Sequence, residues 1–336
     1  MFWAAVSGVA AGVVVVSAAG TALLCRALRQ RAILDHPNER SSHSVPTPRG
    51  AGLAVVGALL AGWLALALIY AGGGLWLILG AGAALAAFSW LDDLRTLSVG
   101  PRLAVQAGAI AAGLFSLSPD ALVFQGTLPL VLDRLLAGLL WLWFVNLYNF
   151  MDGIDGITGV ETATIAGGMV VLGAAIGTTP ILAGFALIAL AAGAAFLPWN
   201  WHPARIFLGD VGSVPLGFLM GWLLLALAAS GQWPAALILP AYYLGDATLT
   251  LAQRAARGDA VWRAHREHAY QRSVQGGRSH DATVTLIGIA NLGLVGLACA
   301  SVLWPGATLP ALGAAVVLTG ALLWYLPRPM TRSSDD

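Results

Sequence analysis

Two amides and two carboxylates follow one another at a spacing of three residues near the middle of the chain. They are Asn146, Asn149, Asp152 and Asp155. On a continuous helix this spacing would place all four side chains on one face. The run 135–145 before them is apolar and aromatic-rich, whereas Gly153 and Gly156 disfavour further helix. The pattern therefore predicts polar side chains that leave the end of an apolar helix and could bind a cation or a phosphate group.

A pair of adjacent carboxylates, Asp92 and Asp93, ends another apolar run, 74–91. Acids at a helix C-terminus face the negative end of the helix dipole, and two neighbouring acids also repel each other. A solvated turn is one interpretation. The alternative is a compensating positive charge, supplied by Arg95, a metal ion or both. Mg²⁺ suits such carboxylates because it prefers oxygen ligands and bridges to phosphates.

A third polar segment, 199–213, ends at the start of an apolar run. Asp210 at that boundary is typical of a helix N-cap. The start of a helix also binds anions, and an Asp beside a bound phosphate could hold the Mg²⁺ that the phosphate brings. The aromatic residues of the segment, Phe207 among them, could stack on a base or anchor the chain at a membrane interface.

The loop 35–50 is basic and rich in proline. Its Arg40, His43 and Arg49 could bind phosphate, because a planar guanidinium can donate hydrogen bonds to two phosphate oxygens at once. The alternative is a loop that only sets the topology beside anionic lipid.

The loop 254–281 contains the sequence His265-Arg266-Glu267-His268. This order matches neither histidine pattern of the zinc proteases, so that class is excluded. Asp246, within the apolar run 233–252, should face the protein interior because an acid in the middle of a span is costly in lipid. Its role stays open.

Long apolar segments position these residues. The chain has 336 residues, of which 58% are hydrophobic and 10% are charged, whereas soluble domains carry about 25% charged residues. About 20 apolar residues cross a membrane. We therefore predict an all-α, polytopic integral membrane protein with eleven transmembrane helices in one domain, 1–336. The predicted spans are 2–24, 51–70, 74–91, 103–118, 134–150, 158–178, 180–198, 211–230, 233–252, 282–303 and 307–326.

The basic residues predict the orientation. The chain has 17 arginines and no lysine, and with the N-terminus outside only Arg134 falls in an outer connection. Because positive charge favours the cytoplasmic side, the N-terminus is predicted to be periplasmic and the C-terminus cytoplasmic. The chemically rich segments then share the cytoplasmic face: 25–50, 92–102, 146–157, 199–213 and 253–281. Two cysteines, Cys25 and Cys299, exclude a disulfide framework.

Taken in order, these motifs resemble the polyprenyl-phosphate N-acetylhexosamine-1-phosphate transferases, the glycosyltransferase 4 family. The matching residues are Asp35-x-Pro37, Arg40, His43, Pro46-x-Pro48-Arg49, Asp92-Asp93, Asn146-x-x-Asn149-x-x-Asp152-Gly-x-Asp155-Gly, Asn200, Gly209-Asp210-x-Gly212-Ser213 and the late His-containing loop. The phospho-MurNAc-pentapeptide translocases of that superfamily carry a His-His-His run where this chain has His265-Arg-Glu-His268. That late loop, together with Arg40-Ser-Ser-His43, looks more like the branch that initiates O-antigen or common-antigen chains. The lysines of the translocase sites have no counterpart here, which argues against a peptide-bearing substrate.

The resemblance implies a Mg²⁺-dependent enzyme, with Mn²⁺ as a substitute. It would transfer a HexNAc-1-phosphate from a UDP-N-acetylhexosamine to undecaprenyl phosphate and release UMP, as the first membrane step of O-antigen or other cell-envelope polysaccharide synthesis. It also implies the bacterial inner membrane, with the active site on its cytoplasmic face. The partners are the two substrates and the lipid bilayer, with no nucleic acid, and a homodimer stays open.

The resemblance also assigns roles to residues. It implies metal ligation by Asp210, Asp92 and Asn149, and catalytic roles for Asp92, Asp93, His265 and His268. The residues implied in substrate binding are Arg40, His43, Arg49, Asn146, Asn149, Asp152, Asp155, Asn200, Phe207 and Arg266. Asp92 could act as a covalent nucleophile, but direct attack by the lipid phosphate is favoured because the acceptor is already an oxyanion.

Two other classes compete with this hypothesis. A transporter or channel would explain many spans, but transporters place polar groups near the midplane in broken helices. A CDP-alcohol phosphotransferase also has an Asp-rich motif, yet its Ala-Arg pair is missing after Asp155-Gly-Ile-Thr.

Overall fold

Long apolar helices make up most of this computed structural model, which describes residues 1–37, 42, 44–70, 75–95, 97–118, 120–176, 180–261 and 265–329. Arg40 and His43 lie outside the described residues. The helices are α1 (Phe2–Gln30), α2 (Gly52–Tyr70), α3 (Leu75–Arg95), α4 (Val99–Leu114), α5 (Leu130–Phe150), α6 (Ile157–Ile176), α7 (Pro180–Asn200), α8 (Asp210–Leu227), α9 (Trp233–Ile238), α10 (Ala241–Ala256), α11 (Ala269–Gln275), α12 (His280–Leu303) and α13 (Thr308–Tyr325). The predicted all-α class is confirmed.

Most of the predicted spans correspond to one long helix each. Among the described residues, nine helical segments are long and apolar enough to cross a membrane, one of them running through α8 and α9. Two predicted spans fall short of that length. The span 103–118 corresponds to α4, which has 16 residues, and the span 233–252 is divided between α9 and α10 at Leu239 and Pro240.

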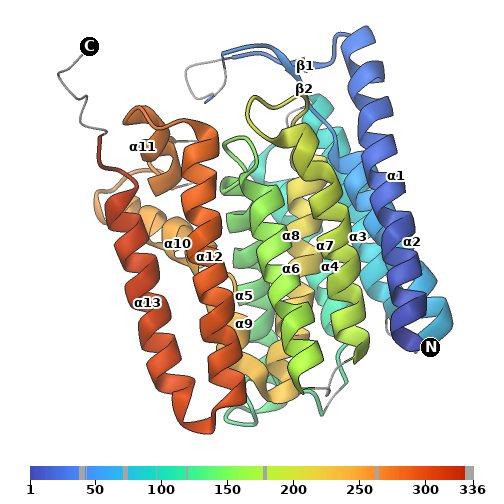
Figure 1. Ribbon diagram of the computed structural model, residues 1–336, viewed down its shortest axis with the longest axis vertical. Coiled ribbons are helices and arrows are strands. Elements are labelled where there is room, and N and C mark those ends of the chain that lie inside the picture. The colour runs from blue at the N-terminus through green and yellow to red at the C-terminus, as the bar shows by residue number, and fades with distance from the viewer. Residues whose placement is uncertain are drawn as a thin grey trace.

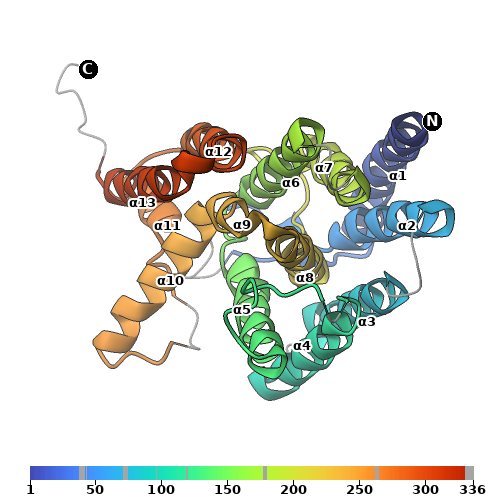
Figure 2. The same cartoon turned by 90° about the horizontal axis from the view of Figure 1, so that it is seen from below.

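Helix α8 lies inside the bundle. It packs against α3 and α5 and also contacts α2, and almost all of its residues are buried. Figure 2 shows α8 enclosed by the other helices, whereas α10 projects away from the bundle. A helix that is hydrophobic all round is stable where its whole surface is covered. The first residue of this covered helix is Asp210.

The polar connections gather at one end of the bundle, the upper end in Figure 1. A short antiparallel hairpin of β1 (Leu34–Asp35) and β2 (Thr47–Pro48) lies there, close to the α7–α8 connection. The backbone joins these segments directly: Phe207 N–H donates to the Pro48 carbonyl at 2.8 Å, and Gly50 N–H donates back to the Phe207 carbonyl at 3.0 Å. The hairpin therefore holds the loop 35–50, the first loop of the chain, against the start of α8.

Two glycines let α2 approach the start of α8. A Cβ added to Gly52 would lie 2.2 Å from the Gly212 nitrogen and 2.3 Å from its Cα, both of which are backbone atoms. Such contact leaves no room for any side chain. Gly57, on the same helix, has nothing within 4 Å of an added Cβ.

The variant Gly52→Ala should lose stability by about 1–3 kcal/mol, because an added methyl group must push the two backbones apart. Gly57→Ala is the matched control and should melt like the wild type. Thermal unfolding of the purified proteins measures both. Equal melting temperatures for the two variants would contradict the close backbone contact.

Candidate active site

The N-terminus of α8 is held by a carboxylate from another helix. Asp93, in the last turn of α3, accepts the Asp210 N–H at 3.2 Å with Oδ1 and the Val211 N–H at 2.9 Å with Oδ2. The residue at the N-cap position is Gly209, with φ 77°, and no side-chain cap bond is made there. Asp210 is therefore not the N-cap, and that sequence-based interpretation is wrong. Its own carboxylate is free for other partners.

Arg49 connects the two carboxylates. Its Nη2 lies 2.9 Å from Oδ1 of Asp93 and 2.7 Å from Oδ1 of Asp210. Burial lowers the pKa of Arg49, but Asp210 and Asp93 outweigh it and raise the pKa above its ordinary value. Arg49 thus stays a cation between two acids, whereas the sequence predicts Arg95 or a metal ion as the compensating charge for Asp92 and Asp93.

Asp92, the neighbour of Asp93, has different partners. It accepts the Leu97 N–H at 2.6 Å and pairs with Arg102 Nε at 2.7 Å. Arg102 Nη1 lies 3.9 Å from Oδ2 of Asp210. Two guanidinium groups therefore bring together the carboxylates of Asp92, Asp93 and Asp210, which we call the acidic group. Arg102 was not predicted as a site residue, although its place just after the acidic end of α3 is a signal that could have found it.

The two asparagines of the central motif lie near the C-terminal end of α5. Asn149 Nδ2 donates to Oδ1 of Asp210 at 3.2 Å and to Oγ of Ser213 at 2.8 Å. Asn146 Nδ2 donates to Gln106 Oε1 at 2.8 Å. Asn149 therefore contacts the acidic group directly, whereas Asn146 lies one turn deeper.

Two cavities meet at this acidic group. The larger, about 290 Å³, is lined by Asp35, Ser42, Arg49, Asn149, Asp152, Gly153, Ile154, Asp155, Asn200, Phe207, Leu208, Gly209, Asp210, Gln271 and His280. The smaller, about 110 Å³, is lined by Leu85, Phe88, Ser89, Asp92, Val99, Arg102, Leu103, Gln106, Asn146, Asn149, Phe150, Asp210 and Val214. Asn149 and Asp210 line both cavities and therefore lie between them.

The rest of the central motif shapes the larger cavity. Asp152 accepts the Thr158 hydroxyl at 2.6 Å. Asn200 accepts the Gly156 N–H at 2.8 Å and donates to the Ile206 carbonyl at 3.1 Å, so its amide joins the α5–α6 and α7–α8 connections. Three residues of the predicted polar stripe, Asn149, Asp152 and Asp155, therefore line the larger cavity, whereas Asn146 lines the smaller one.

The predicted catalytic histidines, His265 and His268, lie near Asp246 and not at the acidic group. His268 Nδ1 is 3.2 Å from Oδ1 of Asp246, and Asp246 also accepts the Ala269 N–H at 2.9 Å and the Tyr270 N–H at 3.4 Å. Asp246 therefore holds the start of α11, which gives this acid a structural role. His265 packs beside His268, with ring centroids 4.8 Å apart and the rings tilted by 37°.

The structure does not bring this histidine group into either cavity. His265, Arg266 and His268 line neither of them. Helix α11 instead contributes Gln271 to the larger cavity, and Tyr270 donates to the Phe150 carbonyl at 2.9 Å.

The acidic group suits a hard divalent cation. Asp210, Asp92 and Asn149 all line the smaller cavity and come from three helices. The two carboxylates supply oxygen ligands, and the Asn149 amide would supply another once it turns its oxygen, rather than its Nδ2, toward the ion. Mg²⁺ takes oxygen ligands of this kind, usually one or two carboxylates together with substrate phosphates and water. Both oxygens of Asp93 are already used by the start of α8, so this residue positions Asp210.

The family model described as glycosyl transferase family 4 matches residues 75–228, the part of the chain that carries the acidic group and the central motif. The chain is therefore similar to glycosyl transferase family 4 over this part of its length. A probable undecaprenyl-phosphate N-acetylglucosaminyl 1-phosphate transferase of Bacillus subtilis is 27% identical over 76% of this chain and 73% of that protein. A decaprenyl-phosphate N-acetylglucosaminephosphotransferase of Mycolicibacterium smegmatis is 28% identical over 84% and 79%.

A shorter similarity extends to a second group of proteins. A phospho-N-acetylmuramoyl-pentapeptide-transferase of Moorella thermoacetica is 41% identical over 90 residues, 26% of this chain and 28% of that protein. The chain is thus a multi-pass membrane transferase similar to these proteins, and the predicted resemblance is confirmed.

The two carboxylates at α8 should respond differently to substitution. Asp93→Ala removes the acceptor of two helix N–H groups and should cost about 0.5–2 kcal/mol of stability. Asp210→Asn keeps its shape and does not cap the helix, so its melting temperature should stay close to that of the wild type. Thermal unfolding distinguishes them, and an Asp210→Asn variant that melts as low as Asp93→Ala would contradict this division of roles.

Asp152 makes the stability depend on pH. Burial raises the pKa of its carboxyl to about 6, above the ordinary value of about 3.9. The folded protein therefore holds this proton more tightly than the unfolded chain, and the resulting stability is present below about pH 4 and lost as the pH rises through about 6.

The variant Asp152→Asn cannot ionise and keeps an oxygen that accepts from Thr158. It should melt higher than the wild type at pH 7 and level with it at pH 4, in buffer without divalent metal. Asp120→Asn, an exposed position, is the control and should follow the wild type at both pH values. A constant difference between Asp152→Asn and the wild type would contradict the raised pKa.

Proposed function

We propose that this chain transfers an N-acetylhexosamine 1-phosphate from a UDP-sugar to undecaprenyl phosphate, giving undecaprenyl-diphosphate-sugar and UMP. The observation that carries the proposal is the position of Asp210, between two cavities and beside Arg49 and Arg102. A reaction between two phosphorylated substrates needs space on both sides of a charge-neutralising centre. The names of the relatives from Bacillus and Mycolicibacterium describe transferases of this kind.

The chemistry is a displacement at phosphorus. An oxygen of the lipid phosphate attacks the sugar-bearing phosphorus of the donor, the bridging P–O bond breaks, and UMP leaves with the electron pair. Both reactants are anionic, so positioned cations lower the barrier most effectively. Arg49 and Arg102 supply fixed positive charge, one on each side of Asp210. Direct attack remains our proposal, because Asp92 is paired with Arg102 and with the Leu97 N–H.

Asp210, Asp92 and Asn149 would hold the Mg²⁺ ion, and Mn²⁺ would substitute for it. When bound, the ion would offset the charge of the diphosphate and of the leaving UMP. Asp93 keeps Asp210 in place through the backbone of α8.

The two cavities suit different substrates. The larger one is polar and is lined by Phe207, Asn200 and Asp152, which suits the uridine and sugar of the donor. The smaller one has Leu85, Phe88 and Leu103 in its wall, apolar side chains that suit the first units of a polyprenyl chain. We therefore assign the donor to the larger cavity and the lipid phosphate to the smaller.

The arginine distribution supports a cytoplasmic position for this end of the bundle, and the enzyme would lie in the bacterial inner membrane. There it would carry out the first membrane step of O-antigen or other cell-envelope polysaccharide synthesis. A transporter is disfavoured, because the acidic group lies at helix ends: Asp93 in the last turn of α3 and Asp210 in the first turn of α8.

The purified protein, incubated with undecaprenyl phosphate, Mg²⁺ and a panel of UDP-N-acetylhexosamines, should release UMP and form a lipid-linked sugar. UDP-N-acetylglucosamine is the first donor to test, since the names of the Bacillus and Mycolicibacterium relatives both contain N-acetylglucosamine. Removing divalent metal with EDTA should stop turnover, and added Mg²⁺ or Mn²⁺ should restore it. Lipid extraction and chromatography of UMP measure both products.

In the same assay Asp210→Asn should reduce turnover by on the order of 10²–10³, the scale expected for loss of a charge-stabilising group. Asp120→Asn should keep wild-type turnover. No lipid-linked product from any donor, or full activity of Asp210→Asn, would remove the proposed reaction or its centre.

A further inference from the structure

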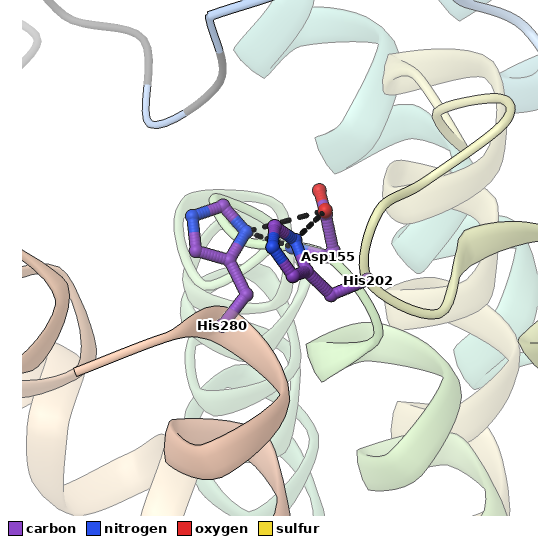
Figure 3. Close-up of side chains that lie close together, drawn as sticks. All are labelled: Asp155, His202 and His280. Carbon is purple, nitrogen blue, oxygen red and sulfur yellow. Dashed lines mark hydrogen bonds and ion pairs between the residues drawn. The ribbon is translucent and has the colours of Figure 1, made fainter.

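A second group of ligand-type side chains lies at the same end of the bundle. Asp155, His202 and His280 each offer one ligand atom, and these atoms all lie within 4.8 Å of one another. His202 Nδ1 is 2.6 Å and His280 Nδ1 is 3.3 Å from the same oxygen, Oδ2 of Asp155. Figure 3 shows the three side chains pointing toward one another from separate segments. None of them belongs to the acidic group around Asp210.

The three residues join segments that are distant in sequence. Asp155 lies in the α5–α6 connection, His202 in the α7–α8 connection, and His280 begins α12. His280 also reaches the first loop, since its Nε2 lies 3.1 Å from the Ser42 carbonyl. Asp155 and His280 line the larger cavity. Anything that binds this group would therefore tie together the segments around the cavity.

The hydrogen bonds of His280 set the state of its ring. Nε2 faces the Ser42 carbonyl, so it carries a proton and donates it. Nδ1 is 3.3 Å from the Asp155 backbone N–H, which donates to it, so Nδ1 presents a lone pair. That lone pair also faces a carboxylate oxygen at 3.3 Å. Two lone pairs repel unless a proton or a metal ion lies between them.

The same arrangement is typical of metal-binding histidines. A histidine ligand usually donates its other ring N–H to a carbonyl or carboxylate, which fixes the tautomer and orients the ring. Asp155 is supported in the same way, because its Oδ2 accepts the Ala204 N–H at 3.1 Å. His280 and Asp155 are both buried, with 5% and 6% of their surface exposed, so neither orientation is set by solvent.

We propose that Asp155, His202 and His280 bind one Zn²⁺ ion, at a site distinct from the oxygen-only group around Asp210. Two imidazoles and one carboxylate suit Zn²⁺, whereas Mg²⁺ prefers oxygen ligands. Zinc binds such ligands at about 2.0–2.2 Å. The 2.6 Å contact between His202 and Asp155 is a hydrogen bond, so binding replaces its proton and moves His202 slightly outward. His202 can do so because its side chain is 37% exposed.

Three protein ligands leave a fourth zinc position for water or a substrate atom. Since Asp155 and His280 line the larger cavity, that position would be open to the space proposed for the donor. The ion would fix the α5–α6, α7–α8 and α12 segments relative to one another. Zinc binding itself does not depend on the proposed transferase reaction.

The test is direct binding of Zn²⁺ to tag-free, metal-stripped protein in detergent, by isothermal titration calorimetry without Mg²⁺ or substrates. We expect one Zn²⁺ per chain and a higher melting temperature with zinc. His202→Ala and His280→Ala should each weaken binding at least tenfold. His36→Ala removes an exposed histidine of the first loop and is the matched control, with unchanged binding.

Two results would overturn the proposal. One is a wild type that binds Zn²⁺ no more tightly than His202→Ala. The other is zinc binding that Asp210→Asn abolishes and His202→Ala leaves intact, which would assign the ion to the acidic group. If the buried His280 variant does not fold, the exposed His202 position still decides between these outcomes.

Discussion

The hydrogen bonds from the start of α8 to Asp93 are the interaction on which the rest of the site depends. A helix N-terminus needs acceptors for its free N–H groups. Here α3 supplies them, so the first residue of α8 does not have to. The Asp210 carboxylate is then available to Arg49 and Asn149. An ordinary structural requirement, met from a neighbouring helix, thus leaves a charged group free for chemistry at the end of a buried helix.

Close backbone packing makes this arrangement precise. The hairpin strand β2 is joined to Phe207, and Gly52 allows α2 to touch Gly212. Arg49 lies between these two contacts, so its position is set by backbone atoms on both sides. The arginine then satisfies two carboxylates that would otherwise repel each other. Packing, capping and charge neutralisation therefore all act on the same few residues.

The sequence predicts the helices and the polar segments well, because apolar length and motif spacing are local properties. The sequence does not show which carboxylate accepts helix N–H groups and which one remains available for a ligand. Asp210 and Asp93 are both acids at helix ends, and only their tertiary contact shows that Asp93 accepts the helix N–H groups. His268 resembles a catalytic residue in sequence, but it pairs with Asp246 to begin α11. The contact of Asp155 with His280 joins residues 125 positions apart, and no local pattern signals it.

The position of the divalent ion decides whether the acidic group around Asp210 is the catalytic centre. Crystals of the protein grown with Mn²⁺ and UDP would locate the ion by anomalous scattering. The strongest peak should lie within coordination distance of Asp210, with Asp92 or Asn149 beside it. A peak elsewhere, with Asp210 still paired to Arg49 alone, would contradict the assignment of this acidic group as the catalytic centre.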